Sequence, residues 1–71
     1  MKQQIQDLLH AAHFQPFTIH MNDGRNFEIK HPDFAYAGPN ALTPVIVEVG
    51  RAQHMLNPRL IASIEHEAAE S

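Results

Sequence analysis

The sequence predicts a small, mainly β domain with one N-terminal α-helix. Three observations support this fold class: an amphipathic pattern over residues 2–13, an alternating pattern over residues 17–31 that reverses at an Asp-Gly pair, and a β-branched run over residues 45–49. The alternative is an α+β fold that ends in a C-terminal helix. The chain of 71 residues forms one domain, 1–71, near the lower size at which a single apolar core suffices.

The composition limits both the means of stabilisation and the classes of partner. The chain has no cysteine, so neither a disulfide framework nor a thiolate zinc site supports the small core. Burial of apolar surface between subunits is then the favoured means of stabilisation. Five Lys and Arg against eight Asp and Glu give a net charge of -3, which repels a polyanion unless the basic residues cluster. There is no membrane-length apolar run and no signal-peptide pattern, so we expect a cytoplasmic protein without membrane contact.

An amphipathic helix is predicted over residues 2–13. Its apolar face follows the i, i+3, i+4, i+7 spacing through Ile5, Leu8, Leu9 and Ala12. His10 and His13 fall in the expected last turn, where partial positive charge suits the helix dipole. Pro16 then prevents continuation of the helix, and the β part of the domain is expected over residues 16–66.

The next element is a β-hairpin. Its apolar residues lie on odd positions in both arms, at Phe17, Ile19, Met21, Phe27 and Ile29. A two-residue loop would place Ile19 opposite Glu28 on one face, whereas a three-residue loop places Ile19 opposite Phe27. The pattern therefore predicts a three-residue loop, with a type I turn at Asn22–Asp23 and a left-handed Gly24.

A bend and three short strands are expected after the hairpin. Pro32 has no N–H to donate and holds His31 extended, so the segment that ends at Asp33 is predicted to bend the chain or to change the sheet edge. The three strands are expected at residues 34–37, 45–49 and 52–56.

The C-terminal segment, residues 58–66, permits two interpretations. Asn57 as N-cap with Pro58 at the first position is a good helix start, and helix-forming residues follow. The alternation over residues 60–65 instead favours one 3₁₀ turn followed by a strand. Residues 67–71 are expected to form an acidic tail.

The hairpin also carries a resemblance to a known family. Ile19, Met21, Asp23, Gly24, Arg25 and Phe27 resemble the first motif of Sm-like proteins, which have the SH3-type barrel. Pro16-Phe17, Asp23-Gly24-Arg25 and His31-Pro32-Asp33-Phe34 together also resemble a group of small bacterial proteins of unknown function. The resemblance implies an open barrel of about five antiparallel strands, a C-terminal strand, and subunits joined by edge strands into a ring or dimer.

Two departures from the Sm-like pattern concern RNA. Ile29 stands where Sm proteins have a glycine, and nothing between Asp33 and Asn40 replaces their RNA-binding loop. The resemblance therefore does not carry an RNA site over to this chain.

Histidine is the unusual feature of the composition, with six residues. His10 and His13 are weak metal-ligand candidates that lack further ligands in sequence, and solvated helix-end residues are the preferred interpretation. His20 near Glu28 on the outer hairpin face suggests an acid/base pair, although cross-strand polar neighbours are normal there. Since the chain has no nucleophile elbow, phosphate-binding loop or paired-carboxylate motif, we expect neither an enzyme nor a cofactor.

The preferred functional interpretation is a homo-oligomeric interaction or assembly module. Its candidate interface residues lie in or beside two predicted edge segments with few charges, 52–56 and 60–65; they are Met55, Leu56, Leu60 and Ile61. The first alternative is an Sm-like RNA-binding protein, and the second is a histidine-based metal-binding protein.

Overall fold

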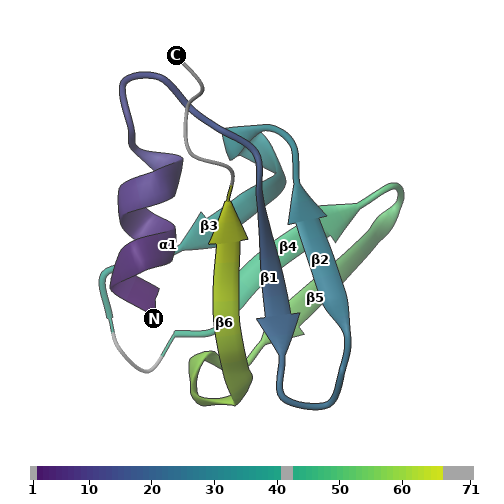
Figure 1. Cartoon of the computed structure of the whole chain (residues 1–71). Coiled ribbons are helices and arrows are strands. Elements are labelled where there is room, and N and C mark those ends of the chain that lie inside the picture. The colour runs from purple at the N-terminus through teal and green to yellow at the C-terminus, as the bar shows by residue number, and fades with distance from the viewer. Residues whose placement is uncertain (1, 41–42, 67–71) are drawn as a thin grey trace.

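The computed structural model describes residues 2–40 and 43–66. This part of the chain is mainly β, as predicted, with one helix, two 3₁₀ turns and six strands in two antiparallel sheets, ordered β2-β1-β6 and β3-β4-β5 (Figure 1). The elements are α1 (Lys2–Leu9), β1 (Phe17–Met21), β2 (Asn26–Ile29), η1 (Pro32–Phe34), β3 (Ala35–Ala37), β4 (Val45–Val49), β5 (Ala52–Leu56), η2 (Pro58–Leu60) and β6 (Ile61–His66).

The hairpin has the predicted register. Ile19 lies opposite Phe27, and both face the core. The Gly24 N–H donates to the Met21 carbonyl at 3.1 Å, which closes the predicted type I turn, and Gly24 has a φ of +95°. The Asp23 carboxylate accepts the Arg25 backbone N–H at 3.1 Å and its Nε at 2.8 Å, which fixes the end of the loop.

The core lies between the two sheets and is covered at one side by α1 (Figure 1). Ile5 is the buried residue of α1, with Leu8 and Leu9 packed partly against the same core. The strands supply the rest from alternate positions; these are Phe17, Ile19, Met21, Phe27, Ile29, Ala37, Val45, Val47, Leu56 and Ile61. In the described residues no strand pairing joins the two sheets, so they do not form a closed barrel.

The N-terminal helix is shorter than predicted, because it ends at Leu9 and not at residue 13. The His10 N–H still donates to the Gln6 carbonyl at 3.0 Å, and the chain then turns away. Phe14 has to reach the core, where its ring meets that of Phe17 edge-on at 6.0 Å, and a continued helix would carry it elsewhere. His10 and His13 therefore do not share one helical face.

The Pro32 segment, where the sequence predicts a bend or a change of sheet edge, marks a change from one sheet to the other. Pro32 occupies the first turn of η1, and the chain passes from β2 in one sheet to β3 in the other. Because Phe34 belongs to this 3₁₀ turn, β3 begins at Ala35, one residue later than predicted.

The second interpretation of residues 58–66 is the one observed. The Asn57 side chain does cap the turn, accepting the Arg59 N–H at 2.9 Å, but η2 stops after Leu60. The following residues pair with β1 as β6, so the C-terminal helix of the alternative fold is not formed there. The predicted tail, 67–71, lies outside the described residues.

No helix within residues 2–40 and 43–66 combines the length and the apolar character needed to cross a membrane.

Candidate functional site

The outer face of the β3-β4-β5 sheet carries an apolar row, formed by Tyr36, Ile46 and Met55. These residues lie directly opposite one another, one on each strand. They point away from the core because Val45 and Val47, the neighbours of Ile46, point into it. Tyr36 is 57% exposed and Met55 is 74% exposed, so the row presents large apolar side chains to solvent.

The β5 strand is an edge of this sheet, as predicted, and in the described chain it pairs only with β4. The loop from β4 to β5 has two residues, and Gly50 has a φ of +60° as a type II′ turn requires at that position. Alternation from this turn directs the backbone N–H and C=O groups of Gln53 and Met55 away from β4. The strand contains no Lys, Arg, Asp or Glu, so it lacks the charges that commonly discourage edge pairing.

Only two of the four predicted interface residues face outward. Met55 is exposed on β5, and Leu60 is 50% exposed in η2. Leu56 is buried because it lies opposite the core residue Val45. Ile61 is also buried, which corrects the expectation that it faces a partner.

A β-bulge explains the burial of Ile61. His20 pairs with Ser63, but the next residue of β1, Met21, pairs with Ile61 and not with Ala62. The extra residue reverses the alternation of β6, so Ile61 turns into the core beside Met21.

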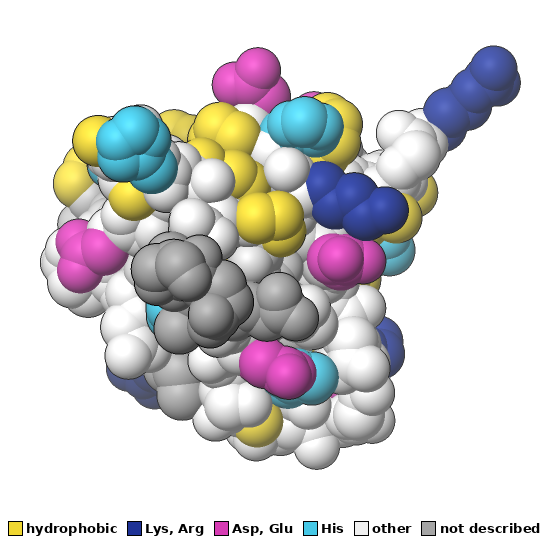
Figure 2. All heavy atoms as spheres, turned by 45° about the horizontal axis from the view of Figure 1, so that its top comes forward, with side chains coloured by type: hydrophobic (Ala, Val, Ile, Leu, Met, Phe, Trp, Pro, Cys, Tyr) yellow, Lys and Arg dark blue, Asp and Glu magenta, His cyan; other side chains and the backbone are white. Residues whose placement is uncertain are grey.

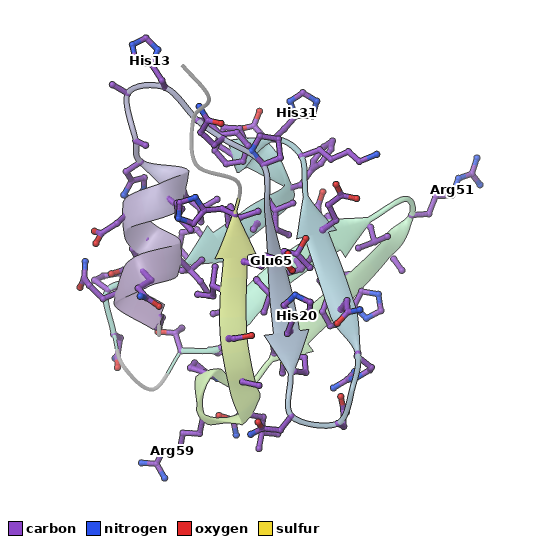
Figure 3. All side chains as sticks on the ribbon, in the orientation of Figure 1. His13, His20, His31, Arg51, Arg59 and Glu65 are labelled. Atoms are coloured by element: carbon purple, nitrogen blue, oxygen red, sulfur yellow. The ribbon has the colours of Figure 1, made fainter. Side chains whose placement is uncertain are left out.

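His20 forms a hydrogen-bonded cluster across the three strands of the other sheet. Its Nδ1 lies 2.8 Å from Asn26 Oδ1 on β2, and its Nε2 lies 2.8 Å from Glu65 Oε1 on β6 (Figure 3). The pKa of His20 is raised above its usual value of 6.5, mainly by the hydrogen bond to Glu65 and to a smaller extent by the hydrogen bond to Asn26. The predicted partner, Glu28, is not the residue that binds His20.

Both ring nitrogens of His20 are engaged in this cluster, which limits the chemistry that the imidazole can perform. Both ring nitrogens face oxygen acceptors, an arrangement that suits the doubly protonated imidazolium. No ring nitrogen remains to accept a proton from a nucleophile such as Ser63, which lies opposite His20. The geometry of this cluster therefore suits a connection between strands better than general-base catalysis.

The remaining histidines do not assemble a ligand set. In the described residues no group of three or more His, Cys, Asp or Glu side chains is placed to hold a metal ion, and this includes the candidates His10 and His13. Two histidine rings pack against phenylalanine rings instead: His31 meets Phe34 edge-on at 5.2 Å, and His54 lies 5.0 Å from Phe27.

The cationic side chains are dispersed. Arg51 lies at the tip of the β4-β5 hairpin and Arg59 at the opposite end of the molecule (Figure 3). Arg25 is paired with Asp23, and its backbone N–H holds the pKa of that carboxyl below its usual value. Lys2 donates to the carbonyls of Asn40 and Thr43. On the face in Figure 2, cationic, anionic and hydrophobic side chains are interspersed.

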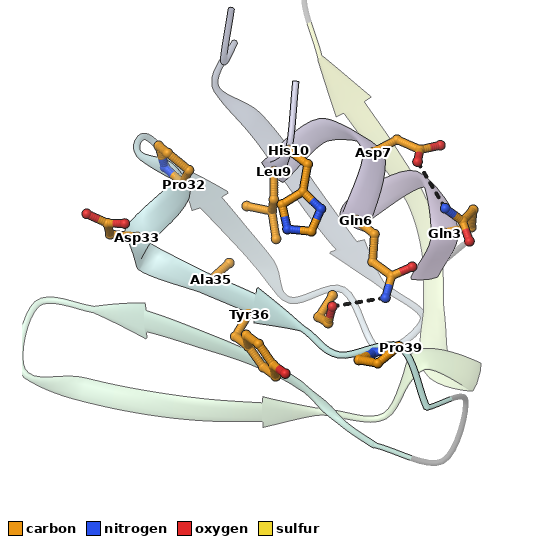
Figure 4. A pocket seen from close by; sticks show the side chains of 11 residues that line it. Gln3, Gln6, Asp7, Leu9, His10, Pro32, Asp33, Ala35, Tyr36 and Pro39 are labelled. Carbon is orange, nitrogen blue, oxygen red and sulfur yellow. Dashed lines mark hydrogen bonds between the residues drawn. The ribbon is translucent and has the colours of Figure 1, made fainter. Parts of the chain in front are cut away.

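An open groove of about 820 Å³ separates α1 from β3 and η1, and we call it the α1–β3 groove (Figure 4). Its lining residues are Gln3, Gln6, Asp7, Leu9, His10, Pro32, Asp33, Ala35, Tyr36, Ala37 and Pro39. Gln6 spans the groove, and its Nε2 donates to the carbonyls of Ala37 at 3.0 Å and Gly38 at 2.6 Å. No local sequence pattern predicts this groove, because its two walls belong to segments that lie far apart in the chain.

Comparison of the chain with protein-family models, with curated proteins and with solved structures finds no match.

Proposed function

We propose that the protein is a homo-oligomeric assembly module whose subunits associate through the β5 edge. The observation that carries this proposal is the exposed Met55 on an uncharged edge strand, at the end of the apolar row. The outward N–H and C=O groups of this edge gain hydrogen bonds when a second strand pairs with it. Burial of Met55 against that strand removes apolar surface from water, and this stabilises a chain whose own core is small.

The choice of partner strand sets the stoichiometry. Pairing of β5 with β5 of a second copy is isologous and gives a twofold dimer with one sheet continuing through both subunits. The Sm-like resemblance implies edge-strand pairing into a ring or a dimer, and pairing of the β5 edge of one copy with a different edge of the next is heterologous and closes into a ring. β5 lies at a sheet edge in either arrangement. Because a dimer and a ring of more subunits differ in molar mass, the measured mass distinguishes the two arrangements.

The decisive test is the molar mass of Met55→Lys, measured by light scattering over a dilution series. The wild-type chain should be oligomeric, and the charged side chain on the edge should shift it toward monomer. Because Met55 is 74% exposed in the protomer, the substitution leaves the core intact, and circular dichroism should show a folded chain. The equivalent substitution of the buried Ile61 is unsuitable, since it would disrupt the core itself.

Gln4→Lys is the matched control, because it adds the same charge at an exposed position of α1, which packs beside β3, the sheet edge opposite β5. It should leave the mass unchanged. A wild-type chain that is a folded monomer at high micromolar concentration would refute the proposal.

A further inference from the structure

The edge of β3 opposite β4 faces the α1–β3 groove. Tyr36 pairs with Ile46, and alternation along β3 turns the backbone groups of Ala35 and Ala37 toward α1. The Gln6 contact agrees with this, since the Ala37 carbonyl accepts from the helix side. In the described part of the chain, no turn, cap or side-chain hydrogen bond engages the N–H or C=O of Ala35.

Gln6 divides the groove into two parts. It crosses the groove by bonding Ala37 and Gly38, and Ala35 lies on the η1 side of this crossing, which we call the outer, open half. In Figure 4, Leu9 and His10 stand on the helix side of that outer half, with Pro32 on the opposite side. The open half thus presents one strand edge between two partly apolar walls, a shape that suits an extended segment.

The charge of the lining restricts the occupant. Asp7 on α1 and Asp33 on η1 contribute carboxylates from opposite walls, and no Lys or Arg is among the lining residues within the described part of the chain. His10 adds at most one positive charge. A nucleic acid or another polyanion is therefore disfavoured, and a basic side chain is favoured.

We propose that the α1–β3 groove binds a short extended peptide segment of a partner protein, which adds a strand to β3 and carries a Lys or Arg between apolar residues. The peptide backbone exchanges hydrogen bonds with the N–H and C=O of Ala35. Its basic side chain lies near the carboxylate of Asp33 or Asp7, and its apolar side chains contact Pro32 and Tyr36. Because β3 has three residues, the contact is short and the complex is weak, with a high-micromolar dissociation constant.

A peptide is a better occupant than a compact small molecule for a physical reason. An unpaired strand edge offers a donor and an acceptor along a line, which an extended backbone matches residue by residue. The site is also separate from β5, since β3 and β5 are opposite edges of one sheet. Peptide binding at β3 and subunit assembly at β5 can therefore be tested separately, and failure of one proposal does not imply failure of the other.

The test is an NMR titration of the ¹⁵N-labelled protein with a capped heptapeptide of alternating valine and lysine. The amide signals of Ala35 and Ala37 should shift, and hydrogen exchange of the Ala35 N–H should slow. The same peptide with glutamate in place of lysine should not bind. A third peptide with N-methylated backbone amides keeps the charge but cannot pair with a strand, so it should bind at least tenfold more weakly.

Two variants test the carboxylates. The double substitution Asp7→Asn and Asp33→Asn should weaken binding by roughly three- to tenfold, as expected for exposed ion pairs. Glu28→Gln, which removes a carboxylate outside this groove, should leave the affinity unchanged. The proposal fails if millimolar peptide causes no shift, if the shifts map to Gln53 and Met55 instead, or if the N-methylated peptide binds equally well.

Discussion

Replacement of Ile5 by alanine tests whether α1 is an integral part of the fold. Ile5 is the buried residue of the helix, and its side chain lies in the cluster shared by both sheets. Truncation of a fully buried isoleucine to alanine typically costs about 2–5 kcal/mol, because transfer and cavity terms add. A 71-residue domain is stabilised by about 4–11 kcal/mol in total, so the change removes a large part of the stability.

The measurement is urea denaturation followed by circular dichroism, at one fixed protein concentration because the proposed assembly would make stability depend on concentration. Ile5→Val keeps most of the side chain and should cost only about 0.5–1.5 kcal/mol. Gln4→Ala, at an exposed position of the same helix, should stay within about 0.5 kcal/mol of the wild type.

The graded series separates packing from helix propensity. Alanine is a better helix former than isoleucine, so an α1 that did not dock would be stabilised by Ile5→Ala. A cost below about 1 kcal/mol would therefore refute the packing of α1 on the core. It would also weaken the description of the α1–β3 groove, whose helix wall depends on that packing.

Three further predictions concern the loop, pH and nucleic acid. Gly24→Val should destabilise the chain by about 1 kcal/mol or more, because a β-branched residue is strained at a φ of +95°, and thermal melting would show it. The raised pKa of His20 means that its contribution to stability is complete below pH 6.5 and is lost as the pH rises through the folded-state value; Glu65→Gln should flatten this dependence in denaturation curves. Fluorescence anisotropy with short RNA and DNA should show no dissociation constant tighter than roughly micromolar near physiological salt, and nanomolar, salt-sensitive binding would favour the RNA-binding alternative.

Local signals predicted the elements whose geometry is decided locally. The hairpin register follows from side-chain parity and from Gly24, because one-residue slippage would expose the whole apolar set. The end of α1 depends instead on Phe14 reaching the core, which is a tertiary contact. The sequence also predicts the cap at Asn57, yet the same cap serves a long helix and a single 3₁₀ turn, and pairing of β6 with β1 decides between them.

The candidate surfaces were harder to predict because they combine distant segments. Glu65 lies 45 positions from His20, so no local pattern connects them. The burial of Ile61 depends on the bulge in β6, which shifts one residue without a glycine to mark it. Met55 was identified correctly as exposed on an edge strand, since alternation within β5 and its few charges are local properties.

The four sheet edges differ in what protects them, and this difference connects assembly with recognition. β2 carries Glu28 and is followed by Lys30, and β6 carries Glu65, so charged side chains oppose pairing at both of these edges. The β3 edge is blocked over part of its length by Gln6 and lies in an acidic groove that admits a narrow, basic segment. Among the four described edge strands, only β5 carries no Lys, Arg, Asp or Glu and has no side chain bonded across its edge. If both proposals hold, pairing at β5 is limited by the availability of another copy, whereas the β3 edge selects its occupant by shape and charge, and one small sheet would support two contacts of different specificity.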